Sequence, residues 1–208
     1  MNRKTLYGGI VAVAFAFTVW TLLHWLVIDP LASDFLSVKA ETETARPIKL
    51  PAWLRVLDVH IAFACLSMIA GALNFSGKLR AARPKRHRAI GYAYIVSVFG
   101  VIVTSGYMAP YATGGQAVGM AFNLLNIVWM SYTIVALVQI KRRQVQRHRN
   151  WMIRSYSLVF TNMGIHLFEA VLARGFGMND ADAYATSVFV TVAALLVAAE
   201  VAVRGFRK

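Results

Sequence analysis

The chain has 208 residues, of which 58% are hydrophobic and 15% charged. This composition lies outside the usual range of soluble domains and indicates that many apolar side chains face lipid. The formal net charge of +13 would suit a nucleic-acid-binding protein, but Lys and Arg cluster in short segments between apolar runs, which is typical of membrane topology signals. We therefore expect no nucleic-acid partner. The single cysteine, Cys65, excludes an intramolecular disulfide and a multi-cysteine metal site.

Six apolar runs are each long enough to cross a hydrocarbon core of about 30 Å at roughly 1.5 Å per helical residue. The first is too long for a secretory signal and has no clear cleavage site, so we predict an uncleaved helix. Asp29 to Pro51 is polar and contains prolines, which indicates a sizeable loop. We predict an all-α polytopic bundle, a single transmembrane domain over 1–208, with spans at about 6–28, 53–75, 89–108, 117–140, 151–173 and 184–203.

The charges of the connecting segments orient this bundle. Six Lys and Arg residues fall within 78–88 and six more within 141–154, whereas the alternate segments 109–116 and 174–183 carry no basic excess. Basic residues also flank the first and last spans. By the positive-inside rule we expect both basic segments and both termini to be cytoplasmic, with the basic segments touching anionic lipid.

Polar residues recur at helical spacing inside three spans. Polar side chains at membrane depth are costly and usually face the protein interior, while small residues permit close helix packing. We therefore predict four inner helices around a polar centre, to which the third span contributes Tyr94, Ser97 and Thr104. The polar and small positions are His60, Ala64, Ser67, Gly71 and Asn74 in the second span, Gly119, Asn123, Asn126 and Thr133 in the fourth, and Ser155, Asn162, His166, Glu169 and Ala173 in the fifth.

His60 and His166 are both expected in the outer third of the membrane, in the same layer as His24 and Glu169. Two facing imidazoles could hold a metal or the iron of haem b if their nitrogens lay about 4 Å apart. One alternative is that each histidine hydrogen-bonds a neighbouring helix as a structural contact. Another is that His60, His166 and Glu169 form a proton or solute pathway.

A second histidine pair, His87 and His148, lies at the cytoplasmic entrances of two helices. With the first pair it would suit a protein that conducts electrons through two haems, with Arg88 and Arg149 neutralising haem propionates. The alternative is that each His-Arg contacts phospholipid phosphate or a neighbouring loop.

Three pieces of the chain carry a resemblance: His60, the turn His87-Arg88-Ala89-Ile90-Gly91-Tyr92, and His148-Arg149-Asn150-Trp151-Met152-Ile153-Arg154-Ser155-Tyr156. From about Trp53 to Ala173 the chain resembles the bacterial membrane family known as domain of unknown function family two-three-zero-six. The resemblance implies a multi-helix protein of the bacterial plasma (inner) membrane and no reaction. It marks His60, His87, His148, Trp151, Arg154 and Tyr156 as motif positions. A site on His166 would be particular to this chain.

A looser resemblance, in helix number and paired histidines, connects the chain with the six-helix cytochrome b561 proteins, although the fourth span lacks a histidine. We predict a membrane redox protein that binds haem b, or else a metal or a quinone. The alternatives are a proton-coupled or small-solute transporter, and an assembly factor that acts through its arginine-rich loops at Arg149 and Arg154. The small residues from Gly115 to Gly119 could also support a homo-oligomer.

Overall fold

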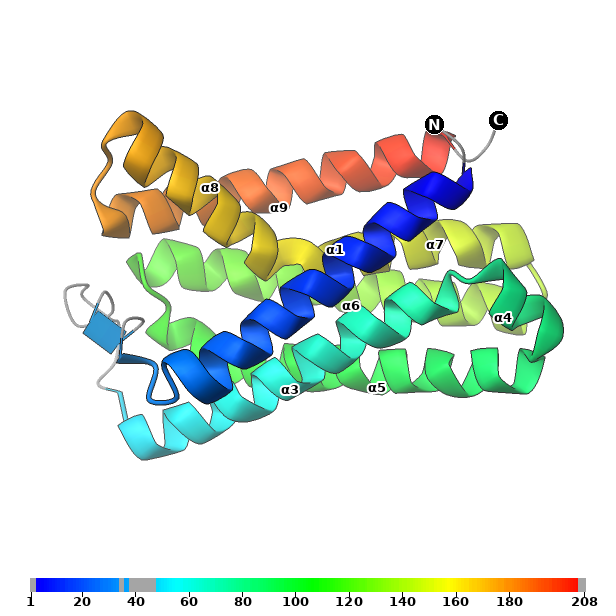
Figure 1. The fold of residues 1–208 in the computed structure, drawn as a ribbon, viewed down its shortest axis with the longest axis horizontal. Coiled ribbons are helices and arrows are strands. Elements are labelled where there is room, and N and C mark those ends of the chain that lie inside the picture. The colour runs from blue at the N-terminus through cyan, green and yellow to red at the C-terminus, as the bar shows by residue number, and fades with distance from the viewer. Residues whose placement is uncertain (1–2, 34–35, 38–47, 206–208) are drawn as a thin grey trace.

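The computed structural model describes residues 3–33, 36–37 and 48–205, and these form a bundle of elongated helices (Figure 1). No strand occurs in the described residues. Six helical segments are long and apolar enough to span a membrane, which confirms the predicted all-α membrane bundle. The helices are α1 (Arg3–Leu23), η1 (His24–Ile28), α3 (Leu50–Asn74), α4 (Gly77–Ala82), α5 (Pro84–Met108), η2 (Ala109–Tyr111), α6 (Gly115–Lys141), α7 (Val145–Ser157), η3 (Leu158–Phe160), α8 (Thr161–Phe176) and α9 (Asp180–Gly205).

Most helices begin a few residues before the predicted spans, because helical backbone continues into the polar flanks. Proline lies in the first turn of both α3 and α5, where its missing N–H and fixed φ suit a helix start. The segments just after Pro84 and just before Trp151 are rich in Lys and Arg, and both residue types have a high helix propensity. Hydropathy therefore reports the apolar part of each helix rather than its full length.

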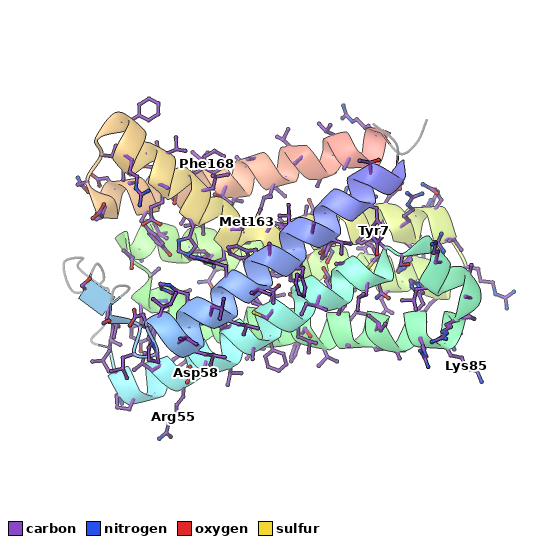
Figure 2. The ribbon with its side chains drawn as sticks, in the orientation of Figure 1. Tyr7, Arg55, Asp58, Lys85, Met163 and Phe168 are labelled. Atoms are coloured by element: carbon purple, nitrogen blue, oxygen red, sulfur yellow. The ribbon has the colours of Figure 1, made fainter. Side chains whose placement is uncertain are left out.

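Both basic segments lie at one end of the bundle. The start of α1, the short helix α4, the turn between α6 and α7, and the end of α9 all meet there (Figure 1). Lys85 projects from this end, which we call the basic end, and Arg55 lies towards the opposite end (Figure 2). Among the described residues, Glu200 is the only acidic side chain near the basic end. The positive-inside rule assigns such an end to the cytoplasm, and that orientation stays a prediction.

The fifth span is not one straight helix. A 3-10 turn, η3, separates α7 from α8, and such a turn takes 3.0 residues per turn instead of 3.6. Three residues at about 20° of extra rotation each turn the face of α8 by roughly 60° relative to a continuous helix. Beyond η3, α8 diverges from the line of α7 and packs against α9 (Figure 1). The prediction of a single polar stripe along 151–173 is therefore wrong.

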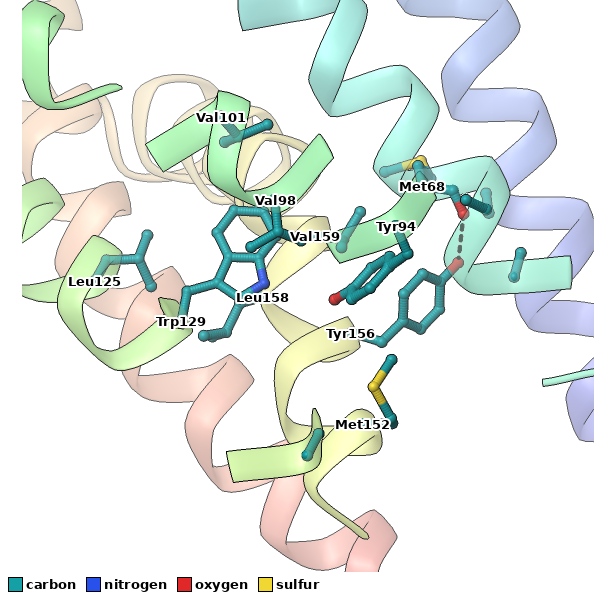
Figure 3. Packing of buried hydrophobic residues seen from close by; sticks show 14 residues of the cluster. Met68, Tyr94, Val98, Val101, Leu125, Trp129, Met152, Tyr156, Leu158 and Val159 are labelled. Carbon is teal, nitrogen blue, oxygen red and sulfur yellow. Dashed lines mark hydrogen bonds between the residues drawn. The ribbon is translucent and has the colours of Figure 1, made fainter. Parts of the chain in front are cut away.

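The larger cluster of buried hydrophobic residues in the described part of the chain lies mainly among α3, α5, α6 and α7. Its centre holds Tyr94, Trp129 and Tyr156, each no more than 5% exposed (Figure 3). Gly71 faces the Tyr156 ring so closely that a Cβ at position 71 would overlap two ring carbons. Glycine at this position therefore allows α3 to approach the tyrosine of α7.

Candidate functional site

His60 projects from α3 towards α5. Its Nδ1 lies 2.9 Å from the hydroxyl of Thr104, which itself donates to the carbonyl of Gly100 at 2.7 Å. Because the Thr104 proton is used in that bond, the hydroxyl accepts from the imidazole, and Nδ1 carries the hydrogen. In a neutral imidazole the lone pair then lies on Nε2. The ring also hydrogen-bonds the backbone of Val101, so two residues of α5 hold His60.

His166 lies on α8 in an aromatic and acidic environment. Its Nδ1 is 3.6 Å from Glu169 Oε2, and its ring meets Trp20 of α1 edge to face with 5.6 Å between centroids. His24 stacks on the same Trp20 indole, with 5.5 Å between the ring centroids. The His166 side chain is 48% exposed. Trp20 thus connects two of the predicted site histidines.

His60 and His166 lie at matching depth on different helices. His60 is ten residues from the start of α3 and His166 ten residues from the end of α8, so each is about 15 Å from the end opposite the basic end. Their neighbours differ, since His60 contacts α5 and His166 contacts α1. No hydrogen bond or ring contact joins the two imidazoles in the described part of the chain.

The predicted polar stripes are only partly buried. Asn126 is 7% exposed and donates to Ser105 Oγ at 3.0 Å, as an inward-facing residue should. Asn123, Asn162 and His166 are instead exposed, so the expectation that they face the interior is wrong. Asn123 lies about 80° around α6 from buried Thr133, at the edge of the inner face. The other two lie on α8, whose face is rotated by η3.

The histidines near the basic end are each held by another helix. His148 Nδ1 is 2.8 Å from the Ala136 carbonyl, which can only accept, so the Nδ1 hydrogen points to α6 and Nε2 is left with its lone pair. With the Asn74 amide turned so that its nitrogen faces His87, that nitrogen is 3.2 Å from His87 Nδ1. Its oxygen then accepts from the Gly91 N–H at 2.9 Å. His148 and Arg80 both lie within electrostatic reach of His87.

Arg154 joins α7 to α9 through a two-point ion pair. Its Nε and Nη2 bind the two oxygens of Glu200 at 2.5 and 2.9 Å, and its guanidinium lies 4.6 Å from the Trp151 ring centroid. Such a forked contact is geometrically specific. Of the other predicted arginines, Arg88 is exposed and Arg149 partly buried. The structure therefore gives Arg154 a helix-pairing contact.

Three hydrogen-bonded hydroxyl groups are buried between α5, α6 and α7. Tyr94 Oη is 2.7 Å from Ser155 Oγ, which is 2.8 Å from Thr133 Oγ1, so one cluster joins α5, α7 and α6. All three residues are at most 2% exposed. Tyr156, next to Ser155, donates to the Met68 carbonyl of α3 at 3.0 Å (Figure 3). The motif ending Arg154-Ser155-Tyr156 thus contacts four helices and stabilises the bundle.

Sequence reasoning did not single out several of these contacts. Trp20 and Glu200 each complete an interaction of a predicted residue, yet each lies in a different span from its partner. Glu200 could have been identified from the sequence as a partner for a basic residue, because it is an isolated carboxylate in an apolar helix that ends among basic residues. For Trp20 no local pattern distinguishes it from other lipid-facing residues. Thr104, the partner of His60, is one of the inward-facing residues that the sequence predicts for the third span.

The described residues contain no group of three or more His, Cys, Asp or Glu side chains placed to hold a metal ion. A site with several protein ligands to one metal is therefore absent from the described part of the chain. Haem b requires only one or two protein ligands to its iron, so the search for groups of three does not bear on it. Gly119, which we considered for a homo-oligomer contact, packs against the Ala109 carbonyl of its own chain.

The fold and these polar groups define a multi-pass helical membrane protein whose basic half is closed by hydroxyl and ionic contacts and whose opposite half exposes imidazole and amide groups. Residues 57–203 match the family of predicted membrane proteins DUF2306. The chain belongs to this family. Neither the curated proteins nor the solved structures contain a match to the chain.

Proposed function

We propose that this protein is a redox protein of the bacterial plasma membrane that binds haem b in the half opposite the basic end, through His60 and His166. The observation that carries the proposal is the exposure of His166, Asn162 and Asn123 within membrane-spanning helices. An unsatisfied polar group that faces hydrocarbon costs on the order of several kcal/mol. A bound cofactor would cover them.

The hydrogen bonds of the two imidazoles are compatible with both rings binding haem iron. The His60 Nδ1–Thr104 bond leaves the lone pair on Nε2, and Glu169 lies beside Nδ1 of His166, which favours the same tautomer there. Both residues also lie at one depth on α3 and α8. Bound haem would supply a one-electron couple with a quinone as a membrane-soluble partner. The chain's own residues would orient the ligands, exclude water and hold charge.

His87 and His148 support a second haem less directly. The lone pair of His148 Nε2 is available, but Asn74 occupies Nδ1 of His87, which leaves the hydrogen of a neutral His87 on Nε2. Ligation by His87 would require the Asn74 amide to turn. A second haem near the basic end, with Arg149 beside it, therefore needs this rearrangement of Asn74.

A visible spectrum of the protein purified in detergent, after expression with added haem, tests the proposal. We expect a Soret band that shifts on reduction, with haem bound in at least a one-to-one ratio. His60→Ala and His166→Ala should each remove that haem, whereas the control Tyr92→Phe, at an exposed position outside the site, should retain it. A purified, folded protein without a Soret band in any preparation would contradict haem binding.

The His166–Glu169 pair also favours a second candidate function, proton transfer. A half-exposed imidazole 3.6 Å from a carboxylate at membrane depth has the groups of a proton relay. This function predicts that proteoliposomes under a pH gradient leak protons and that Glu169→Gln stops the leak. It also predicts a colourless protein, so the spectrum distinguishes the two candidates.

A further inference from the structure

An apolar groove of about 250 Å³ lies between α5 and α6 in the basic half. Its lining consists of Ile95, Val96, Phe99, Met130, Thr133, Ile134 and Leu137. Val96, Phe99 and Ile134 are more than half exposed, so the groove opens to the lipid side of these two spans. In a membrane such a groove is filled by a hydrocarbon chain.

Thr133 shows why the groove excludes polar ligand groups. It is the smallest lining residue and is 2% exposed, which places it at the floor. Its hydroxyl is turned away from the groove, since Oγ1 contacts the Trp129 carbonyl and Ser155 Oγ, both at 2.8 Å. The threonine therefore presents carbon to the groove and leaves no hydrogen-bonding partner for an occupant.

Two cations continue the groove towards the basic end. On α5, Arg88 lies seven residues before Ile95 and eleven before Phe99, so each of these two residues is within about 20° of Arg88 around the helix. On α6, Lys141 lies four residues after Leu137 and seven after Ile134, which places these two residues within about 40° and 20° of Lys141 around the helix. The groove and the two cations thus form one strip along adjacent helices.

Both cations are exposed and available. Neither Arg88 nor Lys141 has an ion pair or side-chain hydrogen bond with any residue that the structure describes. Glu200, the only acidic side chain near this end among the described residues, is bound by Arg154. The strip therefore offers two uncompensated positive charges where the headgroups of one leaflet lie.

We propose that the α5–α6 groove binds one acyl chain of an anionic phospholipid, whose phosphate is held by Arg88 and Lys141. The lining selects a hydrocarbon chain, and the two cations at one end of it select a negatively charged headgroup. This assigns Arg88 to a lipid phosphate, the alternative to a haem propionate that the sequence left open. The assignment is independent of any cofactor.

Native mass spectrometry of delipidated protein tests this with two added lipids of identical chains, phosphatidylglycerol and phosphatidylcholine. We expect preferential binding of phosphatidylglycerol, and a dissociation constant raised on the order of tenfold in the double variant Arg88→Gln/Lys141→Gln. The matched control is Arg86→Gln/Arg143→Gln, which removes the same charge at the same end. Arg86 lies about 160° around α5 from Arg88, and Arg143 lies beyond the end of α6.

A second pair of variants tests the groove itself. Val96→Trp should fill it and weaken phosphatidylglycerol binding, whereas Val103→Trp should not, because Val103 is an exposed valine on the same face of α5 outside the lining. Equal binding by all four variants would overturn the proposal. Loss of binding in Val96→Trp without any effect of Arg88→Gln/Lys141→Gln would also overturn it, because the occupant would then be an uncharged chain.

Discussion

Polar residues are buried and hydrogen-bonded in the basic half of the bundle and partly exposed in the opposite half. In the basic half, Tyr94, Ser155 and Thr133 bind one another and are almost fully buried. In the opposite half, Asn162 and His166 are exposed at membrane depth. Because an unsatisfied polar group is costly in lipid, the first arrangement stabilises the bundle and the second leaves groups available to a bound molecule.

The break in the fifth span explains the contrast. Before η3, α7 packs into the bundle through the motif around Tyr156, and after it α8 packs mainly on α9. A discontinuous span with irregular backbone is tolerated in membranes where the surrounding protein or a cavity satisfies it. The rotation at η3 thus separates a half whose polar groups bind one another from a half whose polar groups are exposed.

The largest effect should come from filling the closest approach in the basic half. Gly71→Ala places a Cβ against the Tyr156 ring, and overpacking of this kind costs about 1–3 kcal/mol or more. We expect a marked fall in the thermal unfolding midpoint in detergent. Gly106→Ala on α5 is the control, because nothing lies within 4 Å of its Cβ position, and it should be neutral or stabilising. Equal melting of the two variants would contradict the packing described for Gly71.

The next largest difference should be between the coupling energies of the two ion pairs, one in each half. A double-mutant cycle with Arg154→Met and Glu200→Gln should give a coupling energy of about 1–2 kcal/mol, because the contact is forked and stacked on Trp151. The same cycle with His166→Gln and Glu169→Gln should give about 0.5 kcal/mol or less, since that pair is 3.6 Å apart and the imidazole half exposed. Unfolding in mixed detergent micelles measures both, and a stronger coupling for the histidine pair would reverse the comparison.

The smallest effects separate a buried hydroxyl from an exposed amide. Tyr94→Phe removes one bond to Ser155 and should lower the free energy of unfolding by about 1 kcal/mol. Asn162→Leu should leave the stability of the cofactor-free protein within about 0.5 kcal/mol, because the exposed amide has no buried partner to lose. A loss in Asn162→Leu as large as that in Tyr94→Phe would show that the opposite half is closed like the basic half.

The site residues were predictable to different degrees. Helical spacing identified buried Asn126, Thr133 and Ser155 correctly, because each lies near the centre of the inner face of its helix. The same rule failed for Asn123 at the edge of a face and for Asn162 beyond η3. A periodic pattern assumes one unbroken helix, and nothing in the residues Leu158–Phe160 marks the 3-10 turn.

The sequence by itself determined the number of spans, their order and the clustering of positive charge. Apolar length and loop charge are local properties of a segment, and they decide directly whether it lies in lipid or in water. It also identified the histidines and the motif from His148 to Tyr156. Only the tertiary structure decided which residue each of them contacts: Thr104 for His60, Trp20 for His166, Ala136 for His148 and Glu200 for Arg154. Those partners lie on other helices, and their positions depend on how the helices tilt, rotate and break, which no local pattern encodes.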